Sequence, residues 1–300
     1  MEFISVIIPT YNRHQSLRRC LDSLTQQTYP KDAFEVIVVD DGSRDATKNA
    51  ALSFTQELSL HYIYKNNGGP GSARNLGIHH AQGAIIAFID DDCIAEKKWL
   101  ENINMFFLNA PKALIVQGNT EVLEKNNLFH KMHEVLSKAA NEKRIVAPEI
   151  NISRKIALFF GPLNAAVKKS ALFEHDLLFD TTFYCGEDID LYRRIKKAGV
   201  DIHFDDKIAV EHLCHYDIVS FIKRFFGYGR GSYHLWAKWQ GKTFAPWVTG
   251  TFTFRSLLRK HGFFSAVAVY FTAPLRIIIT RAGFKYERLK TKKHARILKL

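Results

Sequence analysis

The chain has 300 residues, of which 47% are hydrophobic and 24% are charged, so it can bury a sizeable core in one large domain with an appendage or in two small domains. The formal net charge is +12, and nearly all of it lies in residues 255–300, which hold twelve lysines and arginines and one acidic residue. A basic tail on a nearly neutral body indicates contact with an anionic surface, either lipid or nucleic acid.

The four cysteines form no CxxC pair and no Cys/His cluster with zinc spacing, which is typical of free thiols in a reducing compartment. The N-terminal MEFISVIIPTYNR has no basic leader before a long apolar core, so we expect a cytoplasmic protein.

The first 120 residues alternate strand and helix patterns. Apolar, β-branched runs predict strands at residues 4–8, 35–39, 61–64 and 84–89. Helical periodicity between and after them predicts helices at residues 16–27, 45–57, 71–81 and 97–109. Short apolar strands that alternate with helices predict a parallel sheet with crossover connections. Further on, a strand is expected at 113–117, an amphipathic helix at 126–140 and a helix at 187–198.

Polar clusters follow three of the predicted strands. Pro9-Thr10-Tyr11-Asn12, Asp40-Asp41-Gly42-Ser43 and Asp90-Asp91-Asp92 each come directly after an apolar run. Ligands of such sheets bind outside the carboxyl ends of the strands, so we expect the three clusters to meet in one crevice. Asp90 and Asp92 have the spacing to reach one Mg²⁺ or Mn²⁺ ion, because carboxylates are preferred ligands of both. The alternative is a solvated acidic turn that caps the helix at 97–109.

Two further segments carry candidate chemistry. The segment GGPGSARN (68–75) permits close approach of the backbone, and Arg74 has the charge to meet a phosphate; a plain turn before a helix is the alternative. The segment GEDIDL (186–191) opens the helix at 187–198 with carboxylates, one of which is suited to act as a general base. The alternative is an acidic N-terminal turn that complements the helix dipole.

The segments IIPTYNR, VVDDGS, GGPGSARNLG, IAFIDDDC and GEDIDLYRRIKKAG occur in that order, and together they resemble the family 2 glycosyltransferases over residues 3 to 230. The resemblance implies a GT-A fold: a Rossmann-like α/β arrangement with a mainly parallel sheet flanked by helices. The domain would occupy residues 1–230, and residues 231–300 would form a helical, basic C-terminal region. The activity implied is inverting transfer of a sugar from a nucleotide-diphosphate sugar with help from Mn²⁺ or Mg²⁺.

The resemblance also implies a role for each matching residue. The residues that would bind the nucleotide sugar are Pro9, Tyr11, Asn12, Asp40, Asp41, Arg74, Asp90 and Asp91. Among them, Pro9 and Tyr11 would line the base pocket, and Asp41 with Asp40 would bind the base or ribose. Arg74 would lie by the nucleotide, and Asp91 would approach the ribose or diphosphate.

The metal and the catalytic base complete the implied site. Asp92 would bind the metal, with Asp90 contributing and with His212 as a further ligand; His215 is its rival for this role. Asp188 would be the catalytic base, with Glu187 as the second choice. The segment 160–166 resembles the acceptor side of the family, but the turn that follows reads Leu177-Leu178-Phe179-Asp180, without the glycines usual in the family. This departure concerns the shape of the loop and leaves the class unchanged.

The tail predicts a membrane partner. Residues 263–280 are apolar except for Arg276 and contain Pro274. This run is too short and too interrupted to indicate a membrane-spanning helix. Basic residues flank this run, and an apolar stretch with a basic flank favours an anchor on anionic lipid at the inner face of the cell membrane. The alternative is a helix pair that packs on the core. Nucleic acid is not expected, because the charge lies beside an apolar run.

The predicted function is therefore glycosyl transfer from a nucleotide-diphosphate sugar, with a UDP-sugar favoured, to a glycan or lipid-linked acceptor in cell-surface polysaccharide or glycoconjugate biosynthesis. Two alternatives remain. One is a nucleotidyltransferase, which would need a basic glycine-rich loop near the N-terminus. The other is an inactive scaffold that binds nucleotide sugar or glycan.

Overall fold

The fold is described from a computed structural model. The structure describes residues 1–122, 145–146, 155–157, 159–213, 217–240 and 263–297, so the helix expected at 126–140 lies outside the described residues. The chain forms two compact units, Met1–Leu123 with Lys143–Leu213 and Glu124–Glu142 with Cys214–Leu300. The boundary between the units therefore follows Leu213, whereas the boundary expected after residue 230 falls inside a helix of the second unit.

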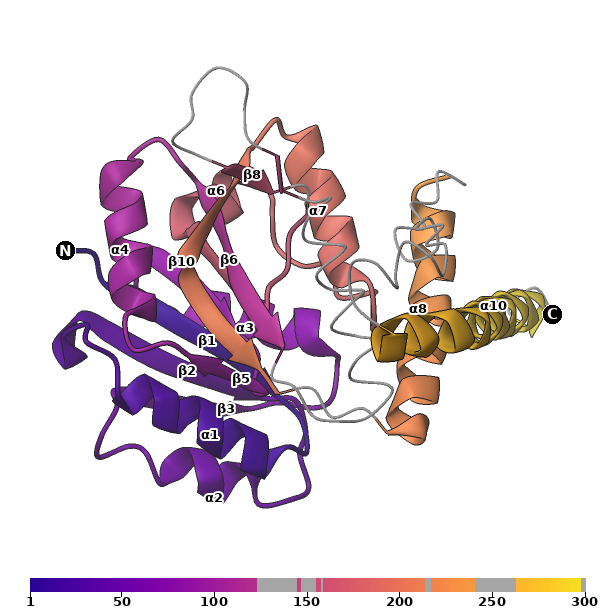
Figure 1. Ribbon diagram of the computed structural model, residues 1–300, viewed down its shortest axis with the longest axis horizontal. Helices are drawn as coiled ribbons and strands as arrows, with labels where there is room; N and C mark the ends of the chain where they lie inside the picture. Colours follow the sequence, from indigo (N-terminus) through magenta and orange to yellow (C-terminus); the bar gives the residue numbers. More distant parts are fainter. Residues whose placement is uncertain (123–144, 147–154, 158, 214–216, 241–262, 298–300) are drawn as a thin grey trace. The chain divides into compact units, whose positions relative to one another are not determined.

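The predicted parallel strands form one half of the sheet in the first unit (Figure 1). They are β1 (Ile4–Thr10), β2 (Phe34–Asp40), β3 (Leu60–Tyr64) and β4 (Ile85–Ile89), in the spatial order β3-β2-β1-β4. Every pairing among them is parallel. All residues of β2 and β4 are buried, as expected for parallel strands covered on both faces.

Beyond β4 the sheet is mixed. The order continues through β9 (Asn164–Lys168), β6 (Ile115–Val122), β10 (Ile202–His212), β8 (Lys155–Ala157) and β7 (Ile145–Val146). Strand β9 pairs antiparallel with both β4 and β6, while β6 and β10 are parallel. A short strand, β5 (Cys93–Ala95), pairs antiparallel with the end of β10. This last pairing brings His212 opposite Cys93, next to the acidic cluster that follows β4.

Helices cover both faces of the sheet. One face carries α1 (His14–Thr25), α2 (Thr47–Leu52) and α4 (Trp99–Asn109), and a single-turn helix, η1 (Lys31–Ala33), precedes β2. The other face carries α3 (Pro70–His80), α6 (Lys169–Glu174) and α7 (Glu187–Lys197). Side chains of β1 alternate between the two cores: Ile4, Val6 and Ile8 pack beneath the first face and Ile7 beneath the second.

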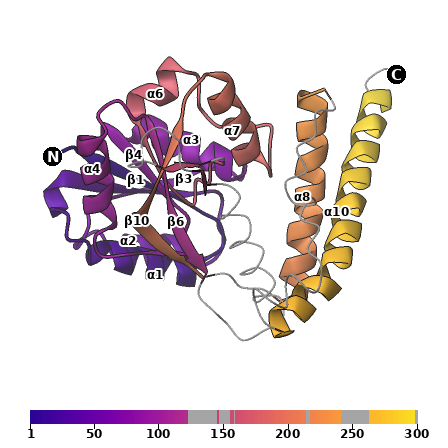
Figure 2. The ribbon, with the colours of Figure 1, turned by 45° about the horizontal axis from the view of Figure 1, so that its top comes forward.

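The second unit contains two long helices, α8 (Ile218–Lys238) and α10 (Phe263–Ile297), which lie side by side (Figure 2). Arg276 of α10 lies over the ring of Phe225 of α8. Further along both helices, Glu287 of α10 pairs with Arg230 of α8, so the two helices run in the same direction. Glycines permit this close approach: a Cβ atom on Gly229 would lie 2.0 Å from the Thr280 carbonyl oxygen. No helix in the described part of the chain combines the length and the apolar character needed to cross a bilayer.

Candidate active site

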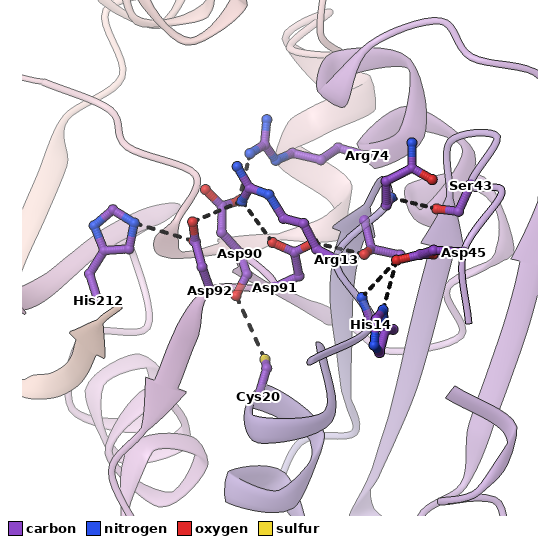
Figure 3. A network of polar contacts seen from close by, with 12 residues as sticks. Arg13, His14, Cys20, Ser43, Asp45, Arg74, Asp90, Asp91, Asp92 and His212 are labelled. Carbon is purple, nitrogen blue, oxygen red and sulfur yellow. Dashed lines mark hydrogen bonds and ion pairs between the residues drawn. The ribbon is translucent and has the colours of Figure 1, made fainter. Parts of the chain in front are cut away.

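The carboxyl ends of β1, β2 and β4 meet, as the polar clusters predicted. The hydroxyl of Thr10 at the end of β1 donates to Oδ2 of Asp91 at 2.7 Å. The backbone N–H of Asp41, which follows β2, donates to the carbonyl of Thr10 at 2.9 Å. The three strand ends are thus joined by direct hydrogen bonds, and the side chains around them form one polar network (Figure 3).

The two aspartates at the end of β2 are buried and hold the loop after it together. Asp40 accepts hydrogen bonds from the Ser43 N–H at 2.7 Å and from the Tyr62 hydroxyl at 2.6 Å. Burial and this bond to Asp40 raise the pKa of Tyr62.

Asp41 accepts from the Nζ of Lys65 at 2.6 Å, and its two oxygens also accept from the backbone N–H groups of residues 68 and 69, at 2.9 and 2.8 Å. Asp41 therefore ties the glycine segment that starts α3 to the end of β2.

The residues expected to line the base pocket lie at the end of β1. Pro9 is half-buried within the strand, and Tyr11 beyond it is exposed. The backbone N–H of Asn12 donates to Oγ of Ser43 at 2.7 Å, and Oδ1 of Asn12 accepts from the N–H of Arg44 at 2.8 Å. These bonds join the loop after β1 to the loop after β2, and Tyr11 in the first of these loops is exposed.

The acidic cluster after β4 faces a cation that the sequence analysis did not single out. Nη1 of Arg13 lies 3.1 Å from Oδ1 of Asp91 and 2.8 Å from Oδ2 of Asp92. Burial raises the pKa of Asp91 to about 7; the charge of Arg13 lowers it, while the charge of Asp92 raises it further. Nothing in the local pattern of PTYNR marks Arg13, because its role depends on the approach of a distant strand end.

Asp92 and His212 fit a divalent cation. The Nε2 atom of His212 lies 3.2 Å from Oδ1 of Asp92. Two neighbouring ligands of an octahedral ion with bonds of about 2.1 Å are about 3.0 Å apart, so the observed separation suits such a pair. Oxygen and imidazole ligands are suited to Mn²⁺. Among the described residues, the group that could hold a metal ion comprises Asp92, Cys93 and His212. The rival His215 lies outside the described residues.

Asp90 and Arg74 have a different environment from the one expected. Arg74, in α3, is buried with 4% of its surface exposed. Its Nη2 donates to Oδ1 of Asp90 at 2.7 Å and its Nη1 to Oε1 of Glu187 at 3.1 Å. In this structure Arg74 thus contacts two carboxylates, and Asp90 lies outside the group formed by Asp92, Cys93 and His212.

The two candidate bases begin α7. Glu187 is buried, and this burial, together with the charge of Asp188, raises its pKa to about 7 despite the ion pair with Arg74. Asp188 is half-buried, and its Oδ1 accepts from the N–H of Ile189 at 2.8 Å. Asp190, whose side chain is fully buried, pairs with Arg194 one turn later at 2.9 Å and therefore has a structural role. Asp188 is thus the more accessible carboxylate of the pair.

The segment expected on the acceptor side contributes to the sheet. Asn164, at the start of β9, accepts from the indole N–H of Trp99 at 2.9 Å and donates to the carbonyl of Ile208 at 3.0 Å. The turn without glycines is fixed to α3, because Asn75 exchanges hydrogen bonds of 2.8 and 2.9 Å with the backbone of Phe179. These bonds hold the segment before α7 in place, so they also orient the start of that helix.

Comparison with known proteins identifies the family. Residues 5–178 match the family model described as Glycosyl transferase family 2. Glycosyltransferase AglE of Haloferax volcanii is 30% identical over 245 residues, which cover 79% of this chain and 75% of AglE. Validoxylamine A glucosyltransferase of Streptomyces hygroscopicus subsp. limoneus is 29% identical over 66% of this chain, which spans 48% of that protein. The chain belongs to glycosyltransferase family 2, and it spans about half the length of some of its curated relatives, as in the second case.

Solved structures show the same fold. The mannosyltransferase PcManGT from Pyrobaculum calidifontis, in complex with GDP-Man and Mn²⁺, aligns with a TM-score of 0.58 at 21% identity, over 99% of this chain and 81% of that one. S. aureus TarS 1–349 in complex with UDP-GlcNAc aligns with a TM-score of 0.58 at 21% identity, over 78% of this chain and 66% of that one. The α/β arrangement, with helices on both faces of a mixed sheet, is therefore the GT-A fold, as the sequence predicted.

Proposed function

We propose that the chain is a metal-dependent, inverting glycosyltransferase that moves a sugar from a nucleotide-diphosphate sugar to a glycan or lipid-linked acceptor. The observation that carries the proposal is the bridge made by Arg74. It joins Asp90, beside the candidate metal ligand Asp92, to Glu187, beside the candidate base Asp188. The bridge supports the proposal because it holds the candidate metal ligand and the candidate base at the same edge of the sheet, as a single displacement needs.

Each residue has a role that follows from its position. Asp92 and His212 would hold Mn²⁺ or Mg²⁺, which when bound would neutralise charge on the leaving diphosphate. Asp188 would take the proton of the acceptor hydroxyl, since it is accessible and lies at the start of α7. Asp40 and Asp41 would shape the nucleotide site by fixing the loop after β2, with Tyr11 exposed beside it.

The donor and the pathway follow from the relatives by analogy. The solved structures hold UDP-GlcNAc in one case and GDP-Man with Mn²⁺ in the other, which supports a nucleotide sugar as donor, and we favour a UDP-sugar. A curated relative from Bacillus spizizenii, 29% identical over 67% of this chain, is a poly(ribitol-phosphate) β-glucosyltransferase. Its name supports an acceptor in cell-surface polysaccharide synthesis. For the basic tail we propose peripheral binding at the inner face of the cell membrane.

The test is release of nucleoside diphosphate from a panel of UDP- and GDP-sugars by the full chain with Mn²⁺. We expect turnover of one donor class, loss of turnover with chelator, and loss of turnover in Asp92→Ala. The exposed variant Asp201→Asn serves as the control and should keep full activity. Inversion is read from the anomeric configuration of the product by NMR. Tight binding of a nucleotide sugar without turnover under all conditions would favour the scaffold function instead.

A further inference from the structure

Arg13 lies where it affects the candidate metal site directly. It follows β1 and reaches the end of β4, where its Nη1 contacts Asp91 at 3.1 Å and Asp92 at 2.8 Å (Figure 3). The two carboxylates have only 4% and 13% of their side-chain surface exposed, whereas the side chain of Arg13 has 49% exposed. The acids are therefore held in place by the fold, while the arginine approaches them from the surface.

The two oxygens of Asp92 have different partners. Oδ1 faces Nε2 of His212 at 3.2 Å, and Oδ2 faces Arg13. The guanidinium thus already supplies positive charge to the carboxylate that would bind the divalent cation. A fixed positive charge a few ångströms from a bound cation repels it, and in partly buried surroundings this repulsion is large.

Arg13 also has the chemistry to leave Asp92 for another anion. A guanidinium is a preferred partner for phosphate oxygens, because its parallel N–H groups match two of them at once. About half of its side chain is exposed, so the arginine can leave the two aspartates without disturbance of the core. A donor that brings a diphosphate to this edge of the sheet would compete with the two aspartates for the guanidinium.

From these contacts we propose that Arg13 is a built-in competitor of the divalent cation at Asp92, and that the diphosphate of the donor draws it away, so that metal and donor bind cooperatively. This inference rests on the proposed metal-dependent function. It assigns to Arg13 a positioning role: the residue keeps the affinity of the empty site for metal low and makes metal binding depend on the donor. Metal and donor would then raise each other's affinity by the same factor, as linkage requires.

The experiment measures Mn²⁺ binding, by electron paramagnetic resonance of the free ion, without nucleotide and with saturating UDP or, in parallel, GDP. For the wild type we expect weak binding of Mn²⁺ alone and a gain within the usual range of about 5- to 150-fold with one of the nucleotides. In Arg13→Gln, Mn²⁺ alone should bind at least about tenfold more tightly, because the repelling charge is gone. The gain on addition of nucleotide should fall several-fold.

Two control variants distinguish the effect of the charge at residue 13 from the effect of side-chain shape and from that of the protein's net charge. Arg13→Lys keeps a positive charge and should retain weak binding of Mn²⁺ alone. Arg19→Gln removes an exposed charge from the same end of the chain and should bind like the wild type. If Arg13→Gln binds Mn²⁺ alone no more tightly than the wild type, while nucleotide still strengthens binding in both, the role of Arg13 is refuted and the proposed function stands. If neither protein binds Mn²⁺ under any condition, the metal-dependent function fails together with the inference.

Discussion

Nη1 of Arg74 lies 3.1 Å from Oε1 of Glu187, and the contact joins helix α3 to the first residue of α7. Because Arg74 also bonds Asp90 at 2.7 Å, one buried guanidinium serves two carboxylates. Glu187 keeps a raised pKa in spite of its cationic neighbour, because burial and the charge of Asp188 raise this pKa by more than the charge of Arg74 lowers it.

The first prediction follows from this bridge. Removal of one partner of a buried ion pair costs about 3–5 kcal/mol, because a charge is left buried without compensation. Asp90 is partly exposed, so we expect the lower end, a loss of about 3 kcal/mol in unfolding free energy for Arg74→Ala. Arg74→Lys should lie between, since one ammonium cannot replace the fork that bonds both carboxylates. Urea unfolding at pH 8 measures the change, and Lys48→Ala on the exposed face of α2 is the matched control. A loss below about 1 kcal/mol would show that the bridge is not important for stability.

The second prediction concerns pH. The pKa of Glu187 rises from 4.5 to about 7 on folding, so between these values the folded state binds more protons at this site than the unfolded state. The contribution of Glu187 to stability is therefore full below pH 4.5 and declines as the pH rises towards 7. Glu187→Gln removes this titration.

The measurement is the unfolding free energy of both proteins at pH 5, 6 and 7. The stability of the wild type relative to Glu187→Gln should fall as the pH rises, with a slope of at most about 1.4 kcal/mol per pH unit. Carboxylates far from Glu187 titrate alike in both proteins and cancel in the difference. A difference that stays constant across this range would contradict the raised pKa.

The third prediction distinguishes the two candidate bases. Asp188→Asn should bind the donor with unchanged affinity but lower kcat by about 10²- to 10⁴-fold, since it removes only the proton acceptor. Glu187→Gln keeps a group that can still bond Arg74, so we expect a smaller loss. Donor affinity is measured by calorimetry and kcat by release of nucleoside diphosphate. If Glu187→Gln loses turnover while Asp188→Asn retains it, the base is Glu187.

Much of the fold followed from local sequence. The apolar runs of β1, β2, β3 and β4 and the helices between them are set by short-range periodicity, so the parallel half of the sheet and the meeting of its carboxyl ends could be predicted. The position of β9 between β4 and β6 could not, because strand order in a sheet depends on pairings between distant segments.

The candidate site, like the fold, could be predicted only in part. The three polar clusters, two of them acidic, were evident, since each follows an apolar strand. The contact between Arg13 and Asp92 and the burial of Arg74 depend on segments far apart in the chain. For Arg74 the glycine segment indicated only close approach of the backbone and a charge suited to phosphate, and the ion pairs with two carboxylates were not predicted. The resemblance implied His212 as a metal ligand, and the structure shows that it is the last residue of β10, placed by pairing with β5.

The last prediction concerns the outward face of α10. Three apolar side chains on it are exposed at helical spacing: Leu275, Ile278 and Leu289. Exposed basic residues accompany them: Arg281, Lys285, Arg288 and Lys290. The opposite face is occupied, since Gly283 and Glu287 pack against α8. An apolar stripe with a basic border is typical of a helix that lies in the surface of an anionic bilayer.

We therefore expect the full chain to co-sediment with vesicles that contain anionic lipid, and to do so less at high salt, because salt screens exposed charges. Each basic residue near such a surface contributes about 1 kcal/mol, so the triple variant Lys285→Gln, Arg288→Gln, Lys290→Gln should bind roughly 100-fold more weakly.

The control carries three neutralised charges elsewhere, at the exposed residues Arg19, Lys48 and Lys97, and should bind like the wild type. Release of nucleoside diphosphate from the donor should be unchanged in the triple variant, because all candidate site residues lie in the first unit. Equal sedimentation of all three proteins, or none at any salt concentration, would exclude α10 as a lipid-binding helix without affecting the family assignment.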